Sequence, residues 1–118
     1  MSTTLDDLTR AVLRFRDERE WARFHTPKNL AMGLGIEAGE LAELFLWKDD
    51  AEIATALTDP AYREKLAHEL ADVQVYLLLL AHGAGIALDE AVVQKLALNA
   101  RKYPVEKARG NAKKYDEL

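Results

Sequence analysis

Apolar residues recur at helical spacing along most of the chain. In the first segment one helix face carries four apolar side chains at about 100° per residue, those of Leu5, Leu8, Val12 and Phe15. The Ser-Thr-Thr run at residues 2–4 supplies candidate N-caps in front of this face. The pattern predicts a helix over residues 4–21.

Two further helices are predicted to begin at a capping residue followed by proline. The pair Thr26-Pro27 has this signature, and the helix behind it is expected to run to about Lys48. The pair Asp59-Pro60 repeats the signature and opens a helix expected to end near His82, because two glycines follow. Both helices are long enough to pack against each other in antiparallel fashion.

A fourth helix and a basic tail complete the chain. Asp89 and Glu90 fit the first turn of a helix, where the helix dipole favours negative charge, and Pro104 ends this helix after Tyr103. Residues 50–58 form a short connection that can itself be helical, and residues 105–118 form a mostly polar tail. No segment alternates with the two-residue period of a strand. We therefore predict an all-α fold that resembles a four-helix bundle.

Composition fits one soluble domain. The chain has 118 residues, 49% of them hydrophobic, and residues 1–118 are expected to form a single domain. The absence of cysteine excludes disulfides and cysteine-ligated metals. With neither a membrane-length apolar stretch nor a leader signature, we expect a cytoplasmic protein without a membrane partner. The helices are apolar over a wider arc than a small monomer can cover, which predicts a homo-oligomer.

Charge is distributed unevenly along the chain. The net charge of -4 at pH 7 argues against a nucleic-acid partner. Residues 29–47 and 66–94 contain no lysine or arginine, and their acidic residues include Glu37, Glu40, Glu43, Glu69 and Asp72. Residues 101–114 carry six basic residues against Glu106 alone. An acidic middle and a basic end could together hold a metal ion and a polyphosphate.

Two carboxylate pairs at a spacing of three residues face the predicted core. Glu37 lies within the apolar arc of its helix with Glu40 beside it, and Glu69 and Asp72 are placed alike on the next helix. Carboxylates in a helical core are very unfavourable unless they are protonated, paired or bound to cations, and no arginine lies nearby. An all-oxygen set suits Mg²⁺, with Mn²⁺ as a substitute. Zinc would require more histidine or cysteine, and a di-iron site would require Glu-x-x-His motifs, which are absent.

Several motifs carry a resemblance to a known family. The pairs Glu37-x-x-Glu40 and Glu69-x-x-Asp72 resemble the Mg²⁺ signature of the MazG-like all-α nucleoside triphosphate pyrophosphohydrolases. The dCTP pyrophosphatase branch is similar in FHTPKNL at residues 24–30, GELAELFLWK at 39–48, ELADV at 69–73 and NARKYP at 99–104. The tail ARGNAKKY at residues 108–115 is also similar. The resemblance extends from about residue 5 to residue 117.

This resemblance implies an enzyme that sanitises the nucleotide pool and assembles as a homotetramer, a dimer of dimers. It implies cleavage of a dNTP between its α and β phosphates, and the Mg²⁺ ligands that it implies are Glu37, Glu40, Glu69 and Asp72. We add Glu43 as a candidate general base or supporting residue. Val12 stands where the vertebrate enzymes have a histidine thought to approach the base. The resemblance leads us to expect that dCTP and modified dCTP are the preferred substrates. Because Val12 replaces that histidine, we expect weaker selectivity than that of a strict dCTPase.

Further residues are candidates for substrate binding. Trp21 and Trp47 could stack on a nucleobase, and His25 could line the base pocket. Tyr76 could bond a carboxylate or the sugar, and Asn99 would need hydrogen-bond partners within its apolar stripe. Candidates for contact with phosphates at the basic end are Lys102, Tyr103, Arg109 and Lys113.

Other interpretations remain open at this point. A Glu-x-x-Glu pair is usually a solvated helix face, and the aromatic residues could simply pack in the core. The main alternative is a non-enzymatic helical interaction or adaptor protein of the same fold, in which the carboxylates are structural. Metal-dependent release of pyrophosphate distinguishes the enzyme from the adaptor.

Overall fold

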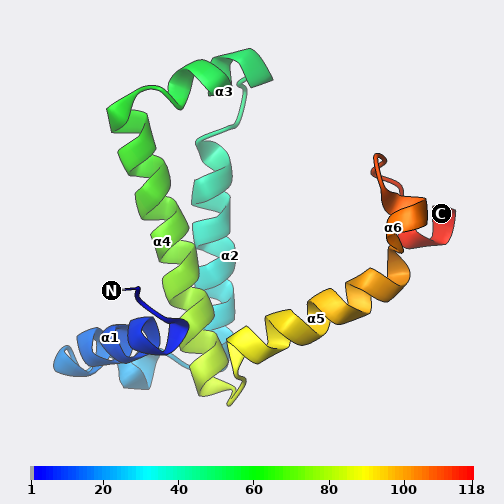
Figure 1. The fold of residues 1–118 in the computed structure, drawn as a ribbon. Helices are drawn as coiled ribbons and strands as arrows, with labels where there is room; N and C mark the ends of the chain where they lie inside the picture. Colours follow the sequence, from blue (N-terminus) through cyan, green and yellow to red (C-terminus); the bar gives the residue numbers. More distant parts are fainter. Residues whose placement is uncertain (1) are drawn as a thin grey trace. The chain divides into compact units, whose positions relative to one another are not determined.

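The computed structural model describes residues 2–118 (Figure 1). Over this range the chain forms six α-helices, two short 3₁₀ helices and no strand, which confirms the predicted all-α class. No single helix in the same range is both long and apolar enough to cross a membrane. The chain divides into two compact units, one ending at Gly85 and the other beginning at Ile86. The assignment of residues 1–118 to a single domain stays a prediction.

The first helices begin at the capping residues. α1 (Leu5–Glu18) starts after Thr4, which forms a reciprocal capping box with Asp7. α2 (Pro27–Glu43) starts after Thr26, whose hydroxyl accepts a hydrogen bond from a backbone amide of the first turn at 3.2 Å. Such caps satisfy amides that have no partner inside the helix, so local chemistry determines where each helix begins.

Both helices end earlier than predicted. α1 stops before residue 21, because Glu20 takes a left-handed backbone conformation (φ 54°) and the 3₁₀ helix η1 (Ala22–Phe24) follows. α2 stops before residue 48, because the chain tightens into turns that lead to Trp47, which is also left-handed (φ 65°). A left-handed backbone at a residue other than glycine costs about 1–3 kcal/mol. At Glu20 a Schellman cap offsets this cost, because the Glu20 amide donates to the Asp17 carbonyl and the Trp21 amide donates to the Arg16 carbonyl.

α2 and α4 form an antiparallel pair. α3 (Asp50–Ala56) joins them at one end, as Figure 1 shows, and the predicted connection is indeed helical. α4 (Pro60–Gly83) begins after Asp59, whose carboxylate accepts a hydrogen bond from the Ala61 amide at 3.2 Å. α4 packs most extensively against α2 and less extensively against α1, which crosses it.

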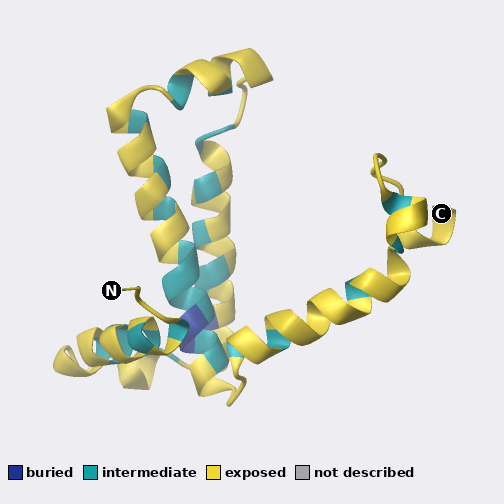
Figure 2. Cartoon of the chain, viewed as in Figure 1, coloured by how far each residue is buried: buried dark blue, intermediate teal, exposed yellow. Residues whose placement is uncertain are grey.

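The core of the first unit is small. Leu30 of α2 and Leu78 and Leu79 of α4 are buried (Figure 2). Among residues 2–118 no polar or charged residue is buried to the same degree. Large apolar side chains remain exposed on the same two helices, among them Met32, Ile36 and Leu70. Apolar faces of this kind mark interfaces in soluble proteins.

The second unit contains α5 (Leu88–Lys102), α6 (Val105–Ala108) and the 3₁₀ helix η2 (Tyr115–Glu117). Two acidic residues occupy the first turn of α5, as predicted. Because α5 belongs to this unit, the first unit contributes only α1, α2 and α4 as long helices, and the four-helix bundle stays a prediction.

The predicted polar tail is partly structured. The rings of Tyr103 and Tyr115 pack edge to face with their centres 6.2 Å apart. The ammonium group of Lys102 lies 4.9 Å from the centre of the Tyr115 ring, a cation–π contact. The tail therefore folds back on the end of α5.

Candidate functional site

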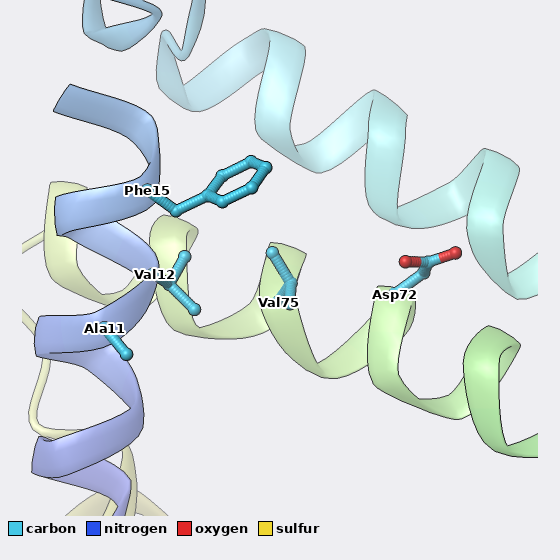
Figure 3. Close-up of a pocket in the computed structure, with 5 residues that line it drawn as sticks. All are labelled: Ala11, Val12, Phe15, Asp72 and Val75. Atoms are coloured by element: carbon cyan, nitrogen blue, oxygen red, sulfur yellow. The ribbon is translucent and has the colours of Figure 1, made fainter. Parts of the chain in front are cut away.

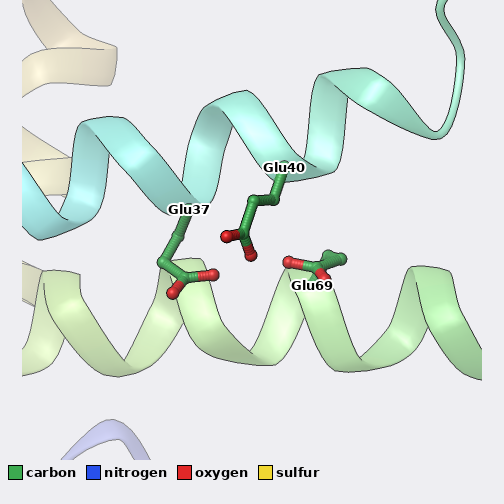
Figure 4. A group of neighbouring side chains, drawn as sticks. All are labelled: Glu37, Glu40 and Glu69. Carbon is green, nitrogen blue, oxygen red and sulfur yellow. The ribbon is translucent and has the colours of Figure 1, made fainter.

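Three carboxylates converge between α2 and α4 (Figure 4). Glu37 and Glu40 lie one turn apart on α2, and Glu69 faces them from α4. One oxygen from each carboxylate lies within 4.8 Å of the others. The geometry follows from the packing, because residues three apart on a helix share a face and α2 and α4 lie side by side.

Mutual repulsion makes this cluster unfavourable when fully ionised. Burial raises the pKa of Glu37 from its ordinary value of 4.5 to about 7, and the Glu40 carboxylate beside it adds to the shift. The pKa of Glu69 is also raised, first by burial and then by the charges of Glu40 and Asp72. Within the described part of the chain no lysine or arginine forms an ion pair with these groups. The cluster therefore needs protons or a cation.

The donor set fits a divalent cation. Glu37 and Glu69 each have a buried oxygen, Oε2, that lacks a hydrogen-bond partner among residues 2–118. Such an atom costs free energy unless a ligand or water satisfies it. A cation that holds oxygens at about 2.0–2.6 Å spans roughly 4–5 Å between opposite ligands, close to the spacing seen here. Carboxylate oxygens suit hard ions such as Mg²⁺ and Mn²⁺.

Asp72, the fourth predicted ligand, connects the cluster to a cavity between α1 and α4 (Figure 3). Its charge acts on both Glu37 and Glu69, which places it beside them. The cavity has a volume of about 390 Å³ and is otherwise lined by Ala11, Val12, Phe15 and Val75. A ligand in this cavity would meet a carboxylate at one end and apolar side chains along its length.

A second cavity, of about 110 Å³, adjoins the first. The two share Val12, Phe15 and Val75. Polar and aromatic groups also line the smaller cavity, namely Arg16, Trp21, His25 and Tyr76. The Nδ1 atom of His25 is buried and has no hydrogen-bond partner among the residues described. The structure thus brings three predicted substrate-binding residues, Trp21, His25 and Tyr76, into one cavity.

Two predicted site residues lie apart from this arrangement. Glu43, the last residue of α2, is exposed and is not among the converging carboxylates. Trp47 is 91% exposed. Trp21 precedes α2 and Trp47 follows it, so a 17-residue helix, about 25 Å long, separates them. One subunit cannot place both indoles on the same base.

The second unit holds the other predicted residues. Asn99 is half-buried on α5, and Lys102 and Tyr103 contribute to the aromatic cluster at the end of that helix. Arg109 and Lys113 are exposed beyond α6. A role for these residues in substrate binding stays a prediction.

Sequence reasoning missed part of the cavity wall. It placed Phe15 only on the apolar face of its helix, it connected Val12 with the base only through the family resemblance, and it did not single out Arg16 or Val75. The spacing of the residues could have indicated Arg16, because Arg16 lies one turn after Val12 and residues four apart share a helix face.

Known proteins resemble this chain over most of its length. Residues 33–118 match the model of the MazG-like family. The chain is 45% identical to dCTP pyrophosphatase 1 of Rattus norvegicus and 44% identical to dCTP pyrophosphatase 1 of Homo sapiens, over 98% of this chain and 68% of each relative. The fold matches the crystal structure of a pyrophosphatase from Archaeoglobus fulgidus with a TM-score of 0.80 and 39% identity, over 88% of this chain and 95% of that one.

The raised pKa of Glu37 predicts how stability depends on pH when divalent cations are removed by EDTA. The carboxyl group titrates near 4.5 in the unfolded chain and near 7 in the folded protein, so the folded state holds an extra proton between these values. The free energy of unfolding should therefore fall as pH rises from about 4.5 to about 7. Urea unfolding across this range, followed by circular dichroism, measures it.

Two substitutions distinguish the contribution of Glu37 from that of other carboxylates. Glu37→Gln should reduce the fall in the free energy of unfolding with rising pH, because glutamine has no proton to lose. Glu18→Gln, at an exposed position at the end of α1 that forms no ion pair among the residues described, should leave the fall as in the parent protein. An equally steep fall in Glu37→Gln would show that another group holds the proton.

Proposed function

The chain belongs to the MazG-like family, and we propose that it is a nucleoside triphosphate pyrophosphohydrolase that converts a dNTP and water to the monophosphate and pyrophosphate. The observation that carries this proposal is the carboxylate cluster, which has two unpaired buried oxygens and lies beside a cavity of about 390 Å³. That volume falls in the usual range for small-molecule sites. The cluster and the named activities of the relatives favour an enzyme over a helical adaptor. We expect it to act on the cytoplasmic nucleotide pool.

We assign the metal ligands to Glu37, Glu40, Glu69 and Asp72, with Mg²⁺ as the ion and Mn²⁺ as a substitute. An ion bound there would neutralise part of the charge of the triphosphate and lower the pKa of the attacking water. The pKa of Glu37 supports this assignment, because a cation would replace the proton that Glu37 otherwise holds. Glu43, one turn beyond Glu40 on α2, is our candidate to accept a proton from the water or to support the ligands.

The cavity beside Trp21, His25 and Tyr76 is our candidate for the base site. Aromatic faces stack on any base, so they supply affinity with little discrimination. The smaller cavity, of about 110 Å³, suits a single-ring base more than a purine. We propose dCTP and its 5-substituted forms as preferred substrates, in keeping with the relatives named dCTP pyrophosphatase 1.

We also propose that the second unit supplies polar and cationic groups to the substrate. The candidates are Asn99, Lys102, Tyr103, Arg109 and Lys113. Cations balance the charge of a triphosphate that a single divalent ion neutralises only in part.

We propose a homo-oligomer, specifically a tetramer built as a dimer of dimers. The exposed apolar faces of α2 and α4, with Met32, Ile36 and Leu70, support association through these helices. Joining helix pairs from two copies would also complete a four-helix bundle. Because α2 separates Trp47 from Trp21, an indole from Trp47 that stacks on a base would do so in the site of another copy.

A panel of nucleotides tests the proposed function. Canonical and 5-substituted deoxynucleoside triphosphates and ribonucleoside triphosphates are incubated with Mg²⁺, and the monophosphate and pyrophosphate are quantified by chromatography. We expect dCTP and 5-methyl-dCTP to turn over fastest and EDTA to stop the reaction. Release of orthophosphate in place of pyrophosphate, or faster turnover of purine nucleotides, would contradict the proposal.

Substitution of single ligands tests the metal assignment. Glu40→Gln and Asp72→Asn each remove one negative charge with little change in volume, and each should lower kcat/KM for dCTP by roughly 10- to 100-fold or more. Helicity by circular dichroism should be unchanged, and Glu64→Gln should retain full activity. Near-normal rates at saturating Mg²⁺ in both ligand variants would refute the assignment.

Light scattering tests the assembly. We expect a mass about four times the 13.3 kDa of one chain at micromolar concentration. Met32→Glu places a charge on the exposed apolar face of α2 and should shift the mass toward that of the monomer. Lys28→Glu, in the polar first turn of the same helix, is the matched control and should not. A stable monomer of the parent protein would contradict the proposal.

A further inference from the structure

Arg16 carries the only permanent charge among the side chains that line the smaller cavity within residues 2–118. Only 21% of its side chain is exposed. Arginine is seldom covered to this extent without a partner or a function, because its charge prefers water. Arg16 is not among the site residues assigned above.

A neighbouring carboxylate orients the Arg16 guanidinium. The Nε and Nη2 atoms of Arg16 both lie 2.8 Å from Oδ1 of Asp17, and Nε donates to it. A guanidinium has five N–H donors in a planar fork. The Asp17 contact engages one edge of the fork and leaves the end of the fork, Nη1 with Nη2, available to a ligand. Asp17 thereby reduces the entropy that Arg16 would lose on binding.

We propose that Arg16 is a specificity-determining residue that recognises a cytosine base by donating two hydrogen bonds to O2 and N3. This proposal rests on the proposed function. Cytosine presents adjacent acceptors at O2 and N3 along its Watson–Crick edge. The two N–H groups at the end of a guanidinium match two adjacent acceptors in the bidentate manner by which arginine recognises other planar acceptor pairs.

The same fork rejects thymine and uracil. These bases carry a hydrogen at N3, so the donor of N3 would face a donor of Arg16. One hydrogen bond would be lost, and a buried donor would be left without an acceptor, which is costly. His25 lines the same cavity, and its Nδ1 is buried without a hydrogen-bond partner among the residues described. A neutral His25 that turned this atom toward the base would accept there from the 4-amino group of cytosine. Thymine and uracil have a carbonyl oxygen at that position.

A substituent at C5 does not meet the fork. The C5 atom lies on the opposite side of the pyrimidine ring from O2 and N3. The contact proposed for Arg16 therefore discriminates cytosine from thymine at the hydrogen-bonding edge and tolerates 5-methylcytosine equally.

The test compares dCTP, 5-methyl-dCTP and dTTP with Mg²⁺ in three variants and the parent protein. Arg16→Met keeps the length of the stem and removes the donors, and Arg16→Lys keeps the charge and removes the planar fork. Arg14→Met is the matched control, because Arg14 is exposed on α1 and does not line the cavity. Thermal unfolding of each variant verifies that the fold is retained.

We expect both Arg16 variants to lower the ratio of kcat/KM for dCTP to that for dTTP by roughly 5- to 150-fold, the range for a bidentate contact to a base. The loss should fall on dCTP and 5-methyl-dCTP alike, whereas kcat/KM for dTTP should stay unchanged or rise, because the donor that opposes its N3 hydrogen is removed. Arg14→Met should keep the parent ratio. Equal losses for all three nucleotides, an unchanged ratio, or full retention of the ratio in Arg16→Lys would each overturn the proposal.

Measurements of nucleotide binding distinguish a failure of this inference from a failure of the proposed function. If the parent protein released pyrophosphate from none of the nucleotides with Mg²⁺ or Mn²⁺, the proposed function would be wrong. Calorimetry with the non-hydrolysable α,β-imido analogues of dCTP and dTTP would still decide the role of Arg16. The proposal holds if the parent protein binds the dCTP analogue more tightly than the dTTP analogue and Arg16→Met abolishes this difference. Equal binding of the two analogues by the parent protein, or no binding of either, would overturn the proposal.

Discussion

Repulsion among the carboxylates between α2 and α4 is the constraint on which the candidate site depends. Glu37, Glu40 and Glu69 lie close together, and the same two helices pack through Leu30, Leu78 and Leu79 toward one end of the pair. The apolar contacts hold together helices that the carboxylates would push apart. A proton at Glu37 relieves part of the repulsion, and a divalent cation would relieve more. Ion binding and stability are therefore linked, because an ion that binds only the folded protein stabilises it.

The sequence predicted those features that local chemistry determines. α1 and α2 begin where Thr4 and Thr26 cap them, because a side chain and an amide three residues apart are enough to start a helix. The convergence of carboxylates followed from helical periodicity and antiparallel packing. The helix ends were less predictable. Glu20 and Trp47 take left-handed conformations that intrinsic propensities disfavour, so the residue types at these positions do not indicate the turns, although local hydrogen bonds from the Glu20 and Trp21 amides close the end of α1.

The cavities could not be predicted from periodicity alone. Val12 and Phe15 lie on the apolar stripe of α1, and the same spacing describes a residue packed in a core and one that lines a cavity. The crossing of α1 over α4 decides between these environments, and crossing geometry depends on many side chains at once. The separation of Trp21 and Trp47 was predictable in part, because the length of the helix between them follows from its residue count.

The origin of the cavity wall suggests how this fold separates chemistry from specificity. The proposed metal ligands come only from α2 and α4, whereas Arg16, Val12 and Phe15 come from α1, which packs less extensively on α4 than α2 does. A triphosphate is common to all nucleotides, so the carboxylate end of the site cannot distinguish one base from another. Discrimination must arise where the base edge meets hydrogen-bonding groups. Substitutions on α1 can therefore change base preference while the ligands on α2 and α4 keep their geometry.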